Sequence, residues 1–105
     1  MIDPECLALV QAMNTVPGIR TVESCCGHGQ TAFRIWFKPD NLECLPDLLY
    51  WFSACHSGCA GWSVKVETDC ARSPVSFFVE GPIGDQGFSD ADEIAKLIKD
   101  DKETA

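Results

Sequence analysis

The most reactive side chains are concentrated in the segment 23–30, Glu-Ser-Cys-Cys-Gly-His-Gly-Gln. Either thiol could act as a nucleophile, because a neighbouring imidazolium such as that of His28 lowers the pKa of a cysteine. The sequence therefore offers Cys25, Cys26 and His28 as candidate catalytic residues. No third group that would orient the histidine can be identified, so the segment locates a site without defining a reaction.

A second Cys/His pair follows later in the chain. His56 and Cys59 lie three positions apart, as do Cys25 and His28. Ligands at this separation can share one ion, and two thiolates with two imidazoles suit tetrahedral Zn²⁺. The sequence thus predicts a zinc site made of these four residues. The alternative is that the cysteines are small buried apolar residues and the histidines bind backbone carbonyls, since the chain has no C-x-x-C motif.

Hydrophobic periodicity and turn residues predict three helices and four strands. Helices are expected over 3–14, over 46–56 after a preliminary turn in 40–45, and from a cap at Ser89 onward. Strands are expected over 19–24, 33–37, 62–69 and 75–80. The clearest loop is 81–87. The inner faces should carry Leu45, Leu48, Leu49 and Phe52 of the second helix, Ile94, Leu97 and Ile98 of the third, and the aliphatic residues Val64, Val66, Val75 and Val79 of the last two strands.

These elements predict an α+β fold in the order α-ββ-α-ββ-α, a two-layer sandwich with a four-stranded, mainly antiparallel sheet and its helices on one face. The reactive segment becomes the tip of the first hairpin, where Gly27 and Gly29 can adopt positive φ. A helix over 46–56 that packs back across the sheet would end near this tip. Cys55, His56 and Cys59 are therefore expected close to the loop.

The other face of the sheet is expected to be open. It would present two aromatic residues among charged ones, which is typical of a surface for a small-molecule ligand or for a homodimer, although single exposed aromatics are also common without a role. The residues on this face are Arg34, Trp36, Lys65, Glu67, Phe78 and Glu80.

Composition excludes several classes of protein. The 105 residues are 46% apolar and 23% charged, which is typical of one globular domain over 1–105. A net charge of −8 disfavours duplex DNA as a partner.

No apolar run approaches the ~20 residues of a membrane helix and no signal peptide is visible, so a cytoplasmic protein is expected. Seven cysteines, an odd number, are expected as free thiols, and residues 101–105 as a frayed tail.

The loop resembles two groups of proteins. The run Glu23–Gly29, followed by Phe-Arg-Ile-Trp-Phe at 33–37, is similar to small uncharacterised bacterial and phage proteins. Thr21 with Ser-Cys-Cys-Gly at 24–27 resembles, more distantly, the Thr…Ser-Cys-Ser-Gly-Arg motif of the wybutosine-synthesising tRNA methyltransferase family. That second resemblance implies S-adenosylmethionine as cofactor and a tRNA substrate. The matching positions Ser24, Cys25 and Gly27 are carried over, which adds Ser24 and Gly27 as candidate cofactor-binding residues.

Two functions follow as hypotheses. The first is a binding or regulatory module, for which zinc would be the expected ion. The second is an enzyme that uses the Cys-His loop, such as an S-adenosylmethionine-dependent RNA-modifying protein. The metal content of the purified protein would discriminate between them, because one stoichiometric zinc favours the first.

Overall fold

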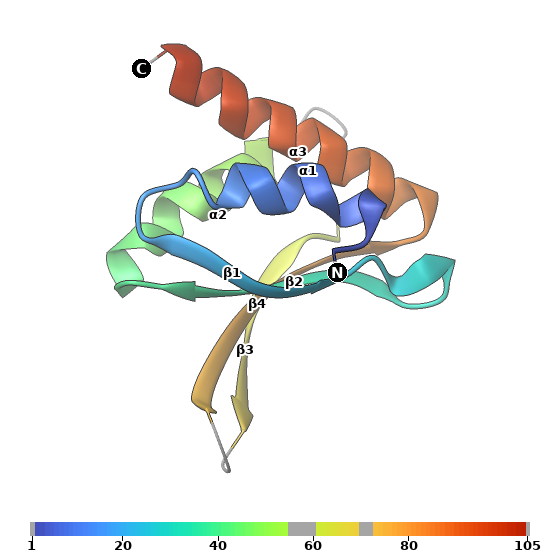
Figure 1. Cartoon of the computed structure of the whole chain (residues 1–105), viewed down its shortest axis with the longest axis horizontal. Helices are drawn as coiled ribbons and strands as arrows, with labels where there is room; N and C mark the ends of the chain where they lie inside the picture. The colour runs from blue at the N-terminus through green and yellow to red at the C-terminus, as the bar shows by residue number, and fades with distance from the viewer. Residues whose placement is uncertain (1, 55–60, 70–72, 105) are drawn as a thin grey trace.

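The computed structural model describes residues 2–54, 61–69 and 73–104 (Figure 1). The predicted element order is confirmed. The elements are α1 (Pro4–Met13), β1 (Ile19–Cys25), the 3₁₀ turn η1 (Gly27–Gly29), β2 (Ala32–Pro39), the 3₁₀ turn η2 (Leu42–Cys44), α2 (Leu45–Ala54), β3 (Ser63–Asp69), β4 (Ser73–Ile83) and α3 (Asp85–Thr104). No helix of the described residues is long and apolar enough to cross a membrane.

The four strands form one sheet in the order β1-β2-β4-β3, and every neighbouring pair is antiparallel. The three helices lie on one side of this sheet, so the expected two-layer α+β arrangement is confirmed (Figure 1). The register pairs Cys25 with Arg34 and Ile35 with Val79. Strand β1, which ends at Cys25, is thus an edge strand held to the sheet by β2.

The core lies between the sheet and the helices. On β2 the alternation is as predicted, because Phe33, Ile35 and Phe37 are buried while Arg34 and Trp36 are half-buried. The fully buried partners of these strand residues come from every helix and from β4: Leu9, Met13, Leu48, Val79, Ile94 and Ile98. Burying one such large side chain contributes about 1.5–3 kcal/mol, so this layer dominates the folding energy.

The predicted loop over 81–87 is wrong. Strand β4 continues to Ile83, and α3 begins at Asp85, before the predicted cap Ser89. Two glycines in this region serve close packing instead of a loop: a Cβ on Gly81 would lie 2.5 Å from the indole of Trp62, and one on Gly87 would lie 2.1 Å from the carbonyl oxygen of Pro82. Glycine in a strand or helix marks such close approaches as well as turns.

The second and third helices differ from the prediction at their ends. Pro46 lies in the first turn of α2 as predicted, and η2 supplies the preliminary turn, but Leu49 is 41% exposed and so is wrongly placed on the buried face. Helix α3 continues to Thr104 across the expected frayed tail, and Asp101 accepts a hydrogen bond from the indole N–H of Trp51. This contact ties residue 101 to α2.

The second hairpin, β3–β4, extends beyond the helix layer (Figure 1). Alternation assigned Val66 and Val75 to the inner face, yet Val66 is 60% exposed and Val75 44% exposed. Val64 and Phe77, which lie nearer to the helices, pack against the core. The expectation of burial is therefore wrong for the outer part of this hairpin, because nothing in the described residues covers it there.

Candidate metal site

The loop between β1 and β2 is built from three consecutive residues in the left-handed region. Gly27, His28 and Gly29 have φ of 79°, 52° and 78°. Among the described residues His28 is the one non-glycine with positive φ, a conformation that costs an ordinary side chain about 1–2 kcal/mol. Gly27 is required here, because a Cβ would lie 2.9 Å from the carbonyl oxygen of Ala32. The turn holds an exposed imidazole close to the start of α1.

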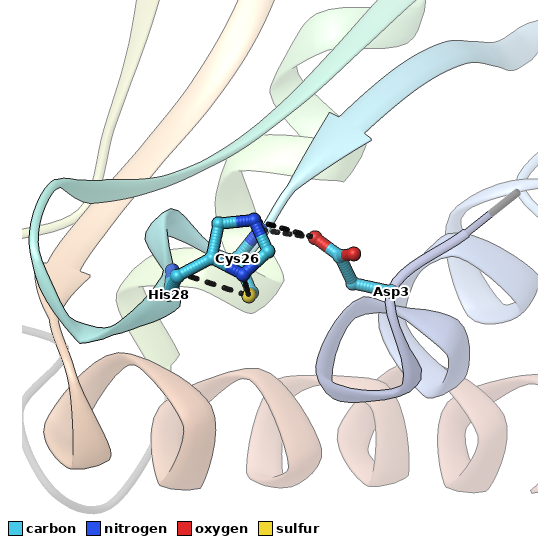
Figure 2. Close-up of polar contacts among 3 residues, drawn as sticks. All are labelled: Asp3, Cys26 and His28. Atoms are coloured by element: carbon cyan, nitrogen blue, oxygen red, sulfur yellow. Dashed lines mark hydrogen bonds and ion pairs between the residues drawn. The ribbon is translucent and has the colours of Figure 1, made fainter.

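Asp3, directly before α1, meets this loop (Figure 2). The backbone N–H of Cys26 donates to Oδ2 of Asp3 at 3.1 Å, and Nε2 of His28 lies 3.9 Å from the same oxygen. Sγ of Cys26 accepts a hydrogen bond from the backbone N–H of His28 at 3.3 Å and lies 3.6 Å from Nδ1 of the ring. The imidazole is thereby placed between a carboxylate and a thiol.

Three potential metal ligands converge at this point. The donor atoms of Asp3, Cys25 and His28 all lie within 4.8 Å of one another. Ligands around a tetrahedral Zn²⁺, with bonds of about 2.0–2.3 Å, are separated by roughly 3.3–3.8 Å. A movement of about 1 Å, within the reach of side-chain rotation on an exposed histidine and two half-buried residues, would bring these donors into coordination distance.

The surroundings of Asp3 lower the pKa of its carboxyl group. The hydrogen bond from the backbone N–H of Cys26 holds the pKa of Asp3 below its ordinary value, with smaller contributions from the Cys26 side chain and from the charge of His28. A carboxylate that stays ionised to lower pH is a better ligand for a positive ion.

Burial raises the pKa of both buried thiols near the site, in contrast to the lowered pKa of Asp3. Burial raises the pKa of Cys26, and Asp3 adds to the effect, although the hydrogen bond from the backbone N–H of His28 acts in the opposite direction. Burial raises the pKa of Cys6 on α1 to about 12, opposed by a hydrogen bond with Ser24. The structure thus gives Cys26 a raised pKa, where an activated nucleophile would need a lowered one.

The predicted site residues have the following places. The donor atoms of Cys25 and His28 lie close together. Cys55, His56 and Cys59 lie outside the described residues, so the zinc site of four residues stays a prediction. Of the residues proposed for cofactor binding, Ser24 bonds to the Cys6 thiol and Gly27 forms the tight turn.

Sequence reasoning missed Asp3. A signal was present: α1 packs on β1, so a chain that runs along the helix and returns along the strand must bring the start of α1 to the end of β1. A return path to the loop was predicted for the helix over 46–56 but not for the first helix.

A cavity of about 370 Å³ lies between α1 and β1, next to the site. Ile2 and Ser24, which directly precede Asp3 and Cys25, line it together with Val10, Thr21, Val22 and Glu23. Its wall combines aliphatic side chains with two hydroxyls and one carboxylate. A small molecule with both apolar and polar groups would fit such a cavity.

Comparison of the chain with family models, with curated proteins and with solved structures gives no match. The two resemblances noted in the sequence therefore stay predictions. The assignment of a function depends on the geometry of the site.

Proposed function

We propose that this protein is a metal-binding module that holds Zn²⁺ through the Asp3 carboxylate, the Cys25 thiolate and the His28 imidazole. The convergence of these three donors from two chain segments is the observation that carries the proposal. A mixed oxygen, sulfur and nitrogen set favours zinc over Ca²⁺ or Mg²⁺, which prefer oxygen ligands. The net charge of −8 further favours a cation as the ligand.

Three protein ligands leave one position of a tetrahedral ion open, as in zinc sites that bind water or a substrate. The 370 Å³ cavity is next to these ligands, because it is lined by Ile2 and Ser24, the residues directly before Asp3 and Cys25. We infer that the fourth position is taken by water or by a small ligand that extends into this cavity. The module would then act as a binding site whose metal supplies part of the affinity.

The direct test is the metal content of protein purified without added metal, followed by zinc titration of the chelator-treated protein in a calorimeter. One zinc per chain is expected, and zinc at 100 times its dissociation constant should stabilise the fold by about 2.7 kcal/mol. Binding should weaken as the pH falls, because protons compete for the thiolate and the imidazole.

Three substitutions remove one donor each. Asp3→Asn keeps an acceptor for the Cys26 N–H, and Cys25→Ser keeps the size of the side chain. His28→Gly deletes the imidazole and suits the positive φ. Each should weaken zinc binding at least tenfold, roughly the lower bound known for changes around a metal ligand. Cys44→Ser is the matched control, since this half-buried thiol is on η2, and it should bind zinc like the wild type. Zinc binding that survives all three substitutions would refute the site.

The alternative is a cysteine enzyme in which His28 lies between Cys26 and Asp3 (Figure 2). Two observations disfavour it: Cys26 is 1% exposed, which denies access to a substrate, and its pKa is raised. Cys25 is the more accessible thiol. Mass spectrometry after brief alkylation separates the two functions, because zinc should protect Cys25 from iodoacetamide, whereas a catalytic cysteine would react quickly with or without zinc.

A further inference from the structure

A second surface feature lies on the opposite side of the helix layer from the sheet. Helices α1 and α3 lie side by side (Figure 1), and between them runs a groove of about 740 Å³. Two stripes at the spacing i, i+3, i+4, i+7 line it: Ala8, Gln11 and Ala12 of α1 with Thr15 of the turn that follows, and Asp92, Ala95, Lys96 and Lys99 of α3. Three of these residues are alanines, whose small side chains permit close approach of another helix.

The charges that line this groove have no partner among the described residues. Asp92, Lys96 and Lys99 are exposed and make no hydrogen bond or ion pair with any residue that the structure describes. The charges of the open sheet face differ, since Glu80 there already bonds to both Arg34 and Lys65. The groove therefore combines uncompensated charges of both signs with small apolar residues.

The order of these charges is self-complementary. Asp92 and Lys99 are separated by seven residues, two helical turns or about 10.5 Å. If a second α3 is laid antiparallel across the first, with a two-fold axis between positions 95 and 96, each Asp92 faces the other chain's Lys99. Ala95 then faces the methylene stem of Lys96. A two-fold interface requires such a pattern, in which one surface is its own complement.

We propose that the α1/α3 groove binds a second copy of this chain, forming an antiparallel two-fold dimer with two Asp92–Lys99 ion pairs. The occupant is a second copy because the charges at the two ends of the stripe are opposite, whereas a groove for a purely acidic or purely basic partner would carry one sign. A dimer through the open sheet face, as predicted from the sequence, would bury less additional apolar surface. Phe78 on that face is only 9% exposed and lies beneath Arg34.

The test uses two single charge reversals, Asp92→Lys and Lys99→Asp. Each variant alone would oppose like charges at both ends of the interface, so its dissociation constant should rise at least about tenfold. An equal mixture of the two variants restores both ion pairs in the heterodimer. There the lysine introduced at position 92 of one chain meets the aspartate introduced at position 99 of the other, and the native Lys99 and Asp92 meet at the opposite end. Native mass spectrometry distinguishes the products, and the heterodimer should exceed both homodimers.

Matched controls carry the same charge changes elsewhere. Lys38→Asp on β2 and Asp47→Lys on α2 alter exposed residues away from the groove and should dimerise like the wild type, alone or mixed. Circular dichroism checks that every variant is folded.

Three outcomes would overturn the proposal. The first is a wild-type chain that stays monomeric in sedimentation from roughly 1 µM to 1 mM, the range in which small interfaces associate. The second is a mixture of the reversed variants that dimerises no better than either alone. The third is a dimer that ignores the charge reversals and is lost in Trp36→Ala, which would assign the interface to the open sheet face instead.

Discussion

Strand β2 keeps Phe33, Ile35 and Phe37 at 0–1% exposure along its inner face, whereas on the inner face of β3 Val64 is half-buried and Val66 is 60% exposed. Both strands alternate apolar and polar residues. The difference lies in what covers them, because β2 runs beneath the helices and the outer part of the β3–β4 hairpin extends past them (Figure 1). Alternation therefore assigns a side chain to a face of the sheet and does not tell whether that face is covered.

The same contrast explains where the candidate metal site is located. The tip of the covered hairpin meets the start of α1, so Asp3 can bond to the Cys26 N–H and approach His28. Cys26 is buried as part of the hydrophobic core, while Cys25 and His28 stay accessible. A site needs both conditions, since buried groups fix its geometry and exposed donors admit the ligand.

The largest expected effect tests the covered half of the comparison. Phe33→Ala should destabilise the protein by about 3–5 kcal/mol, because Phe33 is fully buried and its ring contacts those of Trp62 and Phe88. Denaturant unfolding monitored by circular dichroism measures it. A loss below about 1 kcal/mol would mean that the layer between β2 and the helices is not the core.

The next effect concerns the loop at the tip of the covered hairpin. His28→Val should destabilise the metal-free protein by about 1–3 kcal/mol, since a β-branched side chain is strained at φ 52°. His28→Gly should leave it unchanged or slightly more stable. Both lose the imidazole, so unfolding in the presence of a chelator isolates the backbone effect. Equal stability of the two variants would show that His28 does not adopt the left-handed conformation.

The third effect depends on pH and tests the burial of Cys6, a residue of α1. Burial raises the pKa of this thiol to about 12 from an ordinary value of about 9, so the stability it contributes is complete below about pH 9 and is lost as the pH rises towards 12. The slope is at most about 1.4 kcal/mol per pH unit. Urea unfolding at several alkaline pH values should show a steeper loss for the wild type than for Cys6→Ala. Parallel curves would mean that Cys6 is solvated.

Much of the fold could be predicted from the sequence because the signals were local. The β2 residues alternate without interruption, and Pro46 marks a first helical turn. The glycines misled the prediction: Gly81 and Gly87 were interpreted as loop residues, but they allow Trp62 and the Pro82 carbonyl to approach. Such contacts depend on how neighbouring elements pack, which no local pattern in the sequence shows.

The site could be predicted in part for the same reason. Cys25 and His28 are close in sequence, and a three-residue spacing indicates that they can share a ligand. Asp3 lies twenty-two residues before Cys25, so only the path of the chain through α1 and back along β1 relates them. An acidic residue before a proline at a helix start otherwise favours a capping role, although its side chain makes no capping hydrogen bond here.

The smallest expected effect tests the uncovered half. Val66→Thr changes one methyl group into a hydroxyl at a position paired with Phe77 and 60% exposed. Because threonine is equally β-branched and the hydroxyl reaches water, the free energy of unfolding should change by no more than about 0.5 kcal/mol. Val79→Thr is the matched control on the covered part of β4, where an unpaired hydroxyl would be fully buried and should cost about 1–3 kcal/mol. If the two variants lose equal stability, something covers Val66 in solution and the contrast between the hairpins is lost. A concentration dependence of that loss would identify the cover as a second copy of the chain, bound to a face other than the α1/α3 groove.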